Sequence, residues 1–331
     1  MENKSNITEE MLSKCNDIIS KINNYYSAKM VGQEKLRKSL LATVIANGHI
    51  LLESVPGLAK TTAAKPLPEA ASGKFSRIQC TPDLLPSDII GTQIFNYQNN
   101  NFETKLGPVY ANFVLLDEIN RSSAKTQSAM LEAMQERQTT IGQEVYKMPD
   151  VFIVIATQNP IEQEGTYLLS EAQLDRFLLK EKLEYPTMNE EIEILNRIEN
   201  GAFDKDKKSV IDLKDIQYLQ ETSKMIYMDE SIKRYIVNII YATRHPEKLI
   251  STELAKYVTL GASPRGAISL MEVSKAVALI NNRNYVTPDD VKSLIHSVLR
   301  HRISLNYAAI ADEVTSDDII DAIIGALKTP W

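Results

Sequence analysis

Lys60 and Thr61 directly follow a Pro56-Gly57 turn, at the point where a helix is expected to begin. An apolar run with strand character precedes this turn. In such a loop, backbone N–H groups and the helix N-terminus bind the phosphates of a nucleoside triphosphate, the lysine reaches the β and γ oxygens, and the hydroxyl binds Mg²⁺. Ser54 and Ala59 replace the glycines of the strict pattern, so the loop alone is also compatible with an ordinary strand-turn-helix connection.

Two more apolar runs end in polar groups that could act on a bound phosphate. Phe113–Leu116 leads into Asp117 and Glu118, and the run 151–156 ends shortly before Asn159. Ligands of open α/β sheets bind at the carboxyl ends of the strands. We expect Asp117 to hold the water shell of Mg²⁺, Glu118 to polarise the attacking water as a general base, and Asn159 to orient that water. One such run could be a core strand with an acidic turn, but three in this order predict a nucleotide hydrolase.

Further strings extend this pattern over nearly the whole chain. They are Val31-Gly32-Gln33, Pro56-Gly57-Leu58-Ala59-Lys60-Thr61, Thr81-Pro82-Asp83-Leu84-Leu85-Pro86-Ser87-Asp88, Asp117-Glu118-Ile119-Asn120-Arg121, the segment 132–138, Ala156-Thr157-Gln158-Asn159-Pro160, the segment 171–177 and Gly261-Ala262-Ser263-Pro264-Arg265. With these strings the chain resembles the MoxR-type AAA+ ATPases. The resemblance implies an α/β fold: a P-loop core with a parallel sheet flanked by helices over residues 1–185, and an all-α helical lid domain over residues 186–331.

Two arginines acquire roles through this resemblance. Arg176 matches the arginine finger, which reaches from one subunit into the nucleotide site of its neighbour, and Arg265 matches the sensor 2 arginine of the lid. Ser263 suits a helix N-cap and Pro264 the first helical position. A positive charge in the first turn of a helix is unfavourable because of the helix dipole. A bound phosphate would explain why Arg265 stands there. The alternatives are a surface pair of Arg176 with Asp175 and an exposed Arg265 tolerated at small cost.

The expected ligands are ATP and Mg²⁺, with adenine specificity resting mainly on the resemblance. The expected nucleotide-binding residues are Val31, Gly32, Val55, Pro56, Gly57, Leu58, Ala59, Lys60, Thr61 and Thr62. Thr61 and Asp117 are the expected metal ligands. The expected catalytic residues are Glu118, Asn159, Arg176 and Arg265.

The helix after the loop departs from the family pattern. Pro66 and Pro68 stand where helix-forming residues are usual. A proline inside a helix costs about 3 kcal/mol and kinks or ends it, and the residue before a proline, here Lys65, is expected to be extended. We therefore expect a helix of barely two turns, which supports Lys60 less firmly and affects catalytic rate more than fold.

The remaining pattern predicts the elements that position these residues. Helices are expected from Glu9 to about Tyr26 and from Glu34 to Asn47, and strands alternate with helices up to about residue 183. Segments 91–112 and 138–148 read as hairpins; the resemblance implies that they project toward a ring pore or a partner, and covering a sheet edge is the alternative. After residue 185 helical patterns dominate, including Pro288–Arg302.

Composition excludes several classes of protein. The 331 residues include 37 basic and 43 acidic side chains without a basic block, which disfavours sequence-independent nucleic-acid binding. No apolar run approaches the roughly 20 residues of a membrane helix, and the N-terminus lacks the apolar core of a signal peptide. Cys15 and Cys80 are not in metal-like spacing, so we expect reduced thiols and a cytoplasmic protein.

These observations leave functions from different classes open. The first is an ATP-hydrolysing chaperone: the resemblance implies a homo-oligomeric ring, a hexamer, with Arg176 acting between subunits and with a von Willebrand factor A domain protein and a client as partners. The second is a nucleotide-binding assembly scaffold with little turnover. A DNA-directed AAA+ motor is a third, which the charge balance disfavours.

Overall fold

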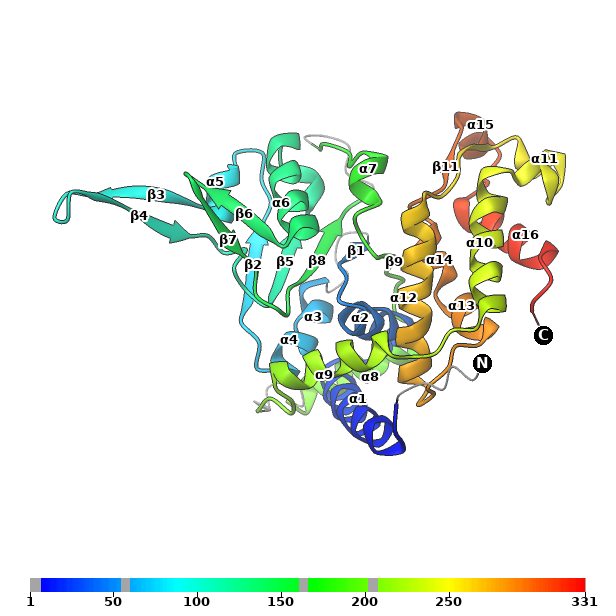
Figure 1. Cartoon of the computed structure of the whole chain (residues 1–331), viewed down its shortest axis with the longest axis horizontal. Helices are drawn as coiled ribbons and strands as arrows, with labels where there is room; N and C mark the ends of the chain where they lie inside the picture. The colour runs from blue at the N-terminus through cyan, green and yellow to red at the C-terminus, as the bar shows by residue number, and fades with distance from the viewer. Residues whose placement is uncertain (1–6, 55–59, 161–165, 202–207, 331) are drawn as a thin grey trace.

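A five-stranded parallel sheet forms the centre of the N-terminal part of the molecule (Figure 1). The computed structural model describes residues 7–54, 60–160, 166–201 and 208–330, and only the backbone of Lys60 and Thr61. The strand order is β2-β5-β8-β1-β9 and every pairing is parallel. The strands are β1 Ile50–Glu53, β2 Phe75–Gln79, β5 Phe113–Asp117, β8 Ile153–Gln158 and β9 Leu179–Lys182. The predicted parallel sheet is therefore confirmed.

Helices cover both faces of this sheet because its central strands are apolar on both sides. On β5, Val114 and Leu116 join the apolar cluster that includes α5 and α6, whereas Leu115 joins the cluster of α1 to α4. Continuous apolar strands of this kind are typical of sheets buried on both faces. The helices are α1 Glu9–Lys29, α2 Glu34–Ile45, α3 Lys60–Ala64, α4 Pro66–Ala70, α5 Pro86–Ile90, the 3₁₀ turn η1 Ile119–Arg121, α6 Ala124–Glu136 and α7 Glu171–Leu174.

The helix after the loop is interrupted where the prolines predicted it, but its geometry differs from the expectation. Lys65 has φ −69° and ψ −40°, so it is helical, and the expectation of an extended residue 65 was wrong. Pro66 takes the first position of α4, where a missing N–H is tolerated. Leu67 lies in the core against α1, and the Tyr26 hydroxyl donates to the Ala63 carbonyl at 3.2 Å. Tertiary packing and this side-chain donor thus keep the chain helical through the break.

Both predicted hairpins are present. The first consists of β3 Gly91–Asn96 and β4 Asn101–Leu106, and the second of β6 Gln138–Ile141 and β7 Glu144–Lys147. Figure 1 shows β3 and β4 extending well away from the sheet. Tyr97, near the tip of this hairpin, is 88% exposed, so its aromatic surface is not used to cover the sheet.

The C-terminal part is helical with one short strand pair. Its elements are α8 Met188–Glu199, α9 Leu213–Lys224, α10 Glu230–Arg244, η2 Pro246–Lys248, α11 Thr252–Ala255, β10 Val258–Leu260, α12 Pro264–Ile280, α13 Pro288–Ser293, α14 Ile295–Leu299, β11 Ser304–Leu305, α15 Tyr307–Ala311 and α16 Ser316–Ala326. Two expectations fail here: Pro288–Arg302 is two helices that break at Leu294, and β10 pairs with β11 in a region expected to lack strands.

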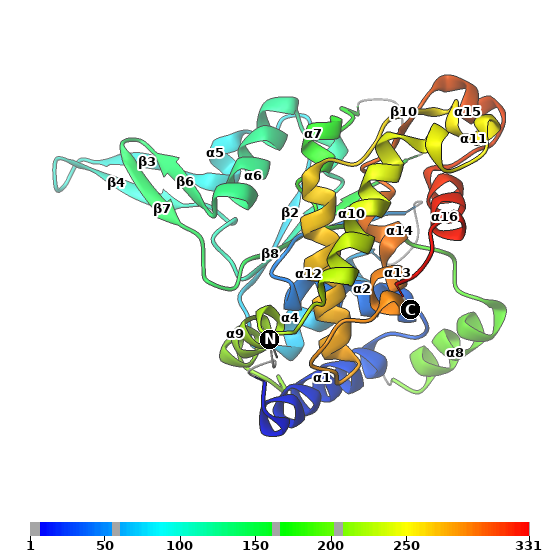
Figure 2. The same ribbon diagram turned by 45° about the vertical axis from the view of Figure 1, so that its right-hand side comes forward.

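The two parts of the chain share one apolar core. Helix α12 packs against α1 and α2, and α9 packs against the same two helices. Helix α8 instead stands apart from the other C-terminal helices (Figure 2), and it has no buried residue. In the described ranges, no helix is both long and apolar enough to span a membrane.

Candidate functional site

The carboxyl ends of β1, β5 and β8 lie side by side. Leu116 of β5 pairs with Ala156 of β8, and Leu52 of β1 pairs with Thr157. Asp117 and Glu118 therefore come to the same sheet edge as Asn159, which directly follows β8. Helix α3, whose backbone begins at Lys60, packs against β5. The structure thus brings together the elements that carry the predicted carboxylates, amide and loop helix.

Asp117 is held from two neighbouring strands. Its side chain is buried, and its Oδ1 accepts a hydrogen bond from Thr157 Oγ1 at 2.8 Å. Its Oδ2 accepts from Arg77 Nη2 at 2.6 Å and from Arg77 Nε at 3.2 Å. Thr157 Oγ1 in turn accepts from the backbone N–H of Glu118 at 2.9 Å. The orientation of this carboxylate is therefore fixed by β2 and β8 together.

Glu118 has a strained backbone and a well-anchored side chain. Its φ of 57° and ψ of 54° are in the left-handed region, which costs a residue with a Cβ about 1–3 kcal/mol and clusters at functional sites. Its Oε2 accepts from Gln79 Nε2 at 3.2 Å and from Arg121 Nε at 3.0 Å. Two side chains thus hold this carboxylate directly after the end of β5.

Asn159 is buried next to this pair of acids. Its exposed fraction is 3%, and its carbonyl accepts from Asn120 Nδ2 at 3.2 Å. Asn120 directly follows the turn residue Ile119, so the strand ends of β5 and β8 are tied to each other beyond the sheet pairing.

The sequence did not predict Arg77 and Gln79, which contact the two acids. Both side chains come from β2. They are two residues apart, and residues at this spacing lie on the same face of a strand. Polar side chains at alternate positions of β2, Arg77 and Gln79, were the available signal. Their partners lie some 40 positions later in the chain, and only the register of β2 with β5 brings them together.

The predicted loop residues are only partly described. Val55, Pro56, Gly57, Leu58 and Ala59 lie outside the described residues. Lys60 and Thr61 form the first turn of α3, with backbone coordinates only. Thr62 is an exposed residue of the same helix.

A cavity of about 460 Å³ lies beside α3. Val31 and Thr62, both predicted to contact the nucleotide, line it, and so do Lys65 and residues of α8 such as Ile194 and Ile198. Its mixed wall of apolar side chains and a few polar groups is typical of small-molecule sites. The cavity therefore lies beside the helix that follows the predicted phosphate loop.

Gly32 closes one side of this region. It has φ +67°, and a Cβ at this position would lie 2.0 Å from Glu190 Oε1. Glu190 also accepts from the backbone N–H of Thr187 at 2.7 Å, which caps α8. A side chain here would be strained by the backbone conformation and would displace the Glu190 side chain, which favours glycine.

Arg176 and Arg265 line a second cavity of about 280 Å³. This cavity is bordered by Asn47 to His49 and by Phe177 and Leu178, the residues that precede β1 and β9. It therefore lies at the amino ends of the strands, whereas Asp117 and Glu118 lie at the carboxyl ends. The structure does not bring the two arginines to the acids of their own chain.

Arg176 is only partly satisfied in its place after α7. Its Nη1 donates to the Leu131 carbonyl at 3.1 Å, whereas its buried Nε has no hydrogen-bond partner among the residues that the structure describes. In the described part of the chain no carboxylate pairs with it, because Asp175 instead accepts from Arg302 Nε at 2.8 Å and from Ser263 Oγ at 2.8 Å. The alternative of an Asp175–Arg176 surface pair is therefore wrong.

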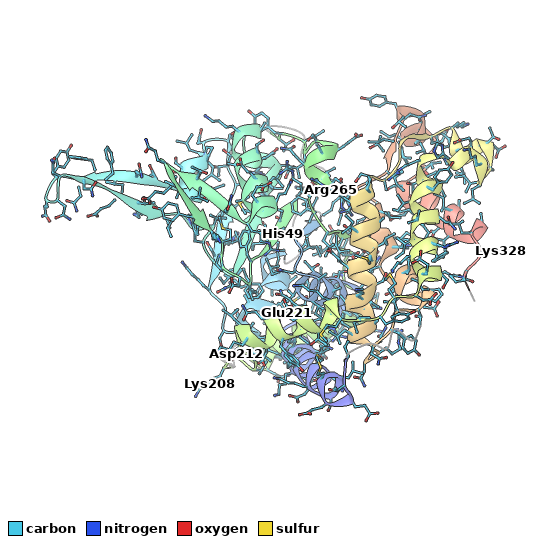
Figure 3. All side chains as sticks on the ribbon, in the orientation of Figure 1. His49, Lys208, Asp212, Glu221, Arg265 and Lys328 are labelled. Atoms are coloured by element: carbon cyan, nitrogen blue, oxygen red, sulfur yellow. The ribbon has the colours of Figure 1, made fainter. Side chains whose placement is uncertain are left out.

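Arg265 begins α12 as expected. Ser263 Oγ accepts from the Arg265 backbone N–H at 3.1 Å, and Pro264 takes the first helical position. The guanidinium is exposed and reaches Gln135 Oε1 at 3.5 Å. Figure 3 shows Arg265 at the end of α12 that lies beside α7.

The same cavity contains groups whose protonation is shifted by burial. Burial lowers the pKa of His49 to about 3, with a smaller effect of Arg137 in the same direction, so His49 is neutral at physiological pH. Its Nδ1 accepts from the Val154 N–H, and Nε2 donates to the Met134 carbonyl. Burial also raises the pKa of Glu272. Neither group therefore offsets Arg176 and Arg265 as strongly as a free carboxylate would.

Comparisons with known proteins identify the family of the chain. The family model for the ATPase family associated with various cellular activities (AAA) matches residues 49–179, and the AAA lid domain matches residues 250–323. The chain is 44% identical over 301 residues to the chaperone MoxR1 of Mycobacterium tuberculosis, covering 91% of this chain and 79% of that protein. The chain belongs to the MoxR-type family of AAA ATPases.

Two further comparisons support the same family. The uncharacterized protein YeaC of Bacillus subtilis is 43% identical over 95% of both chains. A crystal structure of a candidate ATPase from Cytophaga hutchinsonii has a TM-score of 0.90 and 43% identity, and the match covers 97% of each chain. As a member of this family the chain has the predicted fold, an AAA nucleotide-binding sheet with a helical lid. The AAA match contains Asp117, Glu118, Asn159 and Arg176, and the lid match contains Arg265.

The acids of this MoxR-type site suit a magnesium ion that is bound mainly by nucleotide and water. Mg²⁺ is usually held through one or two carboxylates together with substrate phosphates, not in a cage of protein ligands. Within the described residues, no group of three His, Cys, Asp or Glu side chains gathers as a metal site. Asp117 supplies a fixed carboxylate at the edge where the loop helix begins, which fits this mode of binding.

Proposed function

We propose that this MoxR-type protein binds ATP between subunits of a ring, hydrolyses it, and uses the cycle to remodel a client protein as a chaperone. The observation that carries the proposal is the separation of two incomplete sites: the acids at the carboxyl ends of the strands, and the arginines at their amino ends. A second copy of the chain could bring its arginines to the acids of the first.

In the proposed reaction, Lys60 and the loop bind the phosphates of ATP, and Thr61 and Asp117 hold Mg²⁺, which supplies charge neutralisation when bound. Glu118 polarises the attacking water as a general base, and Asn159 orients it. The strained backbone of Glu118 and its anchoring by Gln79 and Arg121 support this role. Adenine would occupy the cavity lined by Val31 and Thr62.

Arg176 and Arg265 would act on the nucleotide of the neighbouring subunit. The buried Nε of Arg176, which no described residue pairs with, supports this role, because a buried donor left unpaired costs free energy that a phosphate could recover. An arginine supplied in this way stabilises the charge that develops on the transferred phosphoryl group.

The family resemblance extends the proposal to assembly and partners. We infer a hexameric ring in the cytoplasm. Each subunit has a core over residues 1–185 and a lid over residues 186–331. A von Willebrand factor A domain protein would present the client. The relative named as the chaperone MoxR1 supports the chaperone role. The protruding hairpin β3–β4, with exposed Tyr97, offers a surface for client contact.

Phosphate release by the purified chain tests the proposal, with Glu118→Gln as the comparison. Turnover well above that of the variant supports the ATPase. Equal release by both chains, with ATP still bound, would instead favour the assembly scaffold, for which the interruption between α3 and α4 is the supporting observation.

A further inference from the structure

A salt bridge engages the carboxylate that is expected to serve the metal. Arg77 Nη2 lies 2.6 Å from Asp117 Oδ2, and the Asp117 side chain is 9% exposed. Thr157 already donates to the other oxygen. Both oxygens of Asp117 therefore have protein donors, and the donor at Oδ2 is a positively charged guanidinium.

We propose that Arg77 is a resting-state substitute for the divalent cation: it competes with Mg²⁺ for Asp117 and so sets the Mg²⁺ concentration at which the site can work. The inference rests on the proposed function, because it assigns Asp117 to the metal. Arg77 becomes a positioning residue, which acts through Asp117 without contacting the reacting atoms.

The nature of the contact favours competition over a permanent structural bond. A guanidinium is charged at every physiological pH, so the contact does not depend on protonation. Its two donors, Nη2 and Nε, both go to the single oxygen Oδ2, and the Arg77 side chain is 48% exposed. The guanidinium thus lies half in solvent while the carboxylate is buried, and a doubly charged ion attracts that carboxylate more strongly than a single positive charge does.

The Arg77 side chain also has an alternative position when it leaves Asp117. It belongs to β2, the edge strand of the sheet, so one side of the strand has no neighbouring strand. Its Nη2 already shares a second acceptor, Gln79 Oε1, at 3.1 Å. Gln79 in turn donates to Glu118. When Arg77 leaves Asp117, it can keep its hydrogen bond to Gln79, the residue that also holds the general base Glu118. Binding of the metal at Asp117 is therefore coupled to the position of Glu118.

Calorimetric binding of the non-hydrolysable analogue AMP-PNP at a series of Mg²⁺ concentrations tests the competition. We expect Arg77→Gln to lower the Mg²⁺ concentration needed for half-maximal tightening by about threefold to tenfold, with affinity in EDTA unchanged within about twofold. Arg77→Lys keeps a cation and should remain near the wild type. An unchanged or higher Mg²⁺ requirement in Arg77→Gln would overturn the inference.

Arg283→Gln is the matched control. Arg283 also pairs with a buried aspartate, Asp290, but in the lid, so this variant should lose thermal stability while its Mg²⁺ requirement stays at the wild-type value. A shift of the requirement in Arg283→Gln as large as in Arg77→Gln would show a general effect of instability and would also overturn the inference.

A second measurement follows the metal itself. Mn²⁺ binding in the presence of AMP-PNP, followed by electron paramagnetic resonance, should be tighter in Arg77→Gln than in the wild type, and the gain should vanish in Arg77→Gln combined with Asp117→Asn. Equal Mn²⁺ affinity of wild type and Arg77→Gln contradicts the competition. A wild-type chain that binds no AMP-PNP contradicts the proposed function instead, so the two failures are distinguishable.

Discussion

The two edges of the central sheet differ in how far their charged groups are satisfied. At the carboxyl edge, Asp117 and Glu118 each have at least two donors within the chain. At the amino edge, no described residue pairs with the buried Nε of Arg176, and Arg265 donates to a side-chain amide at 3.5 Å. One edge is organised by contacts within the chain, and the other leaves positive groups incompletely paired among the described residues.

Of the predicted changes, removal of the Arg176 guanidinium at the amino edge should have the largest effect. We expect Arg176→Ala to lower kcat for ATP hydrolysis by about 10³-fold or more, because such an arginine stabilises the charge of the transition state. ATP affinity should change little, since the base cavity and loop are untouched. Steady-state phosphate release and calorimetric ATP binding measure the two effects.

Arg234→Ala is the control for that variant, because Arg234 is an exposed residue of α10 with a 79% exposed side chain. Its turnover should match the wild type. Normal turnover in Arg176→Ala would remove Arg176 from the site.

At the carboxyl edge, Glu118→Gln should lower kcat by about 10²- to 10⁴-fold, the usual contribution of a general base. The amide can still accept from Gln79 and Arg121, so folding and ATP binding should persist. The measurement is single-turnover hydrolysis with bound ATP, and Glu221→Gln on α9 is the neutral comparison. A Glu118→Gln chain that hydrolyses ATP normally would place the base elsewhere.

At the amino edge, His49 predicts a pH dependence of folding. Its folded pKa of about 3 lies below the ordinary value of 6.5, so the unfolded chain takes up the proton first. Its contribution is complete above pH 6.5 and declines by about 1.4 kcal/mol per pH unit toward pH 3. Urea unfolding between pH 7 and 5 should show a steeper loss for wild type than for His49→Gln. Burial also lowers the pKa of His301, which contributes in the same direction to the wild type and to His49→Gln. Equal dependence of the unfolding free energy on pH in the two proteins would therefore refute the assignment to His49.

The smallest expected effect concerns Gly32, which lies between two residues that line the cavity beside α3. Gly32→Ala should destabilise the fold by about 1–2 kcal/mol, because the residue has φ +67° and its new Cβ meets Glu190. Gly325→Ala has open space around the added carbon and should be neutral or slightly stabilising. Thermal unfolding distinguishes the two; a Gly32→Ala variant as stable as Gly325→Ala would show that the α8 cap adjusts freely.

The parts of the carboxyl edge that the sequence predicted are those encoded by local pattern. Buried apolar runs that end in Asp117, Glu118 and Asn159 specify both strand and side chain within a few residues. Arg77 was not predicted because its partner depends on the register between β2 and β5. Lys65 was predicted wrongly because packing of Leu67 and the Tyr26 hydroxyl outweighs the local preference before a proline. Strands β10 and β11, of three and two residues, are too short to show a period.

Mixing two inactive chains tests most directly whether the two edges belong to one site in neighbouring subunits. Glu118→Gln retains the arginine edge, and Arg176→Ala retains the acid edge. In rings assembled at random from equal amounts of both, about a quarter of the interfaces would join an intact acid edge to an intact arginine edge. We therefore predict that the mixture recovers about a quarter of wild-type phosphate release, whereas a mixture as inactive as either variant alone would contradict catalysis between subunits.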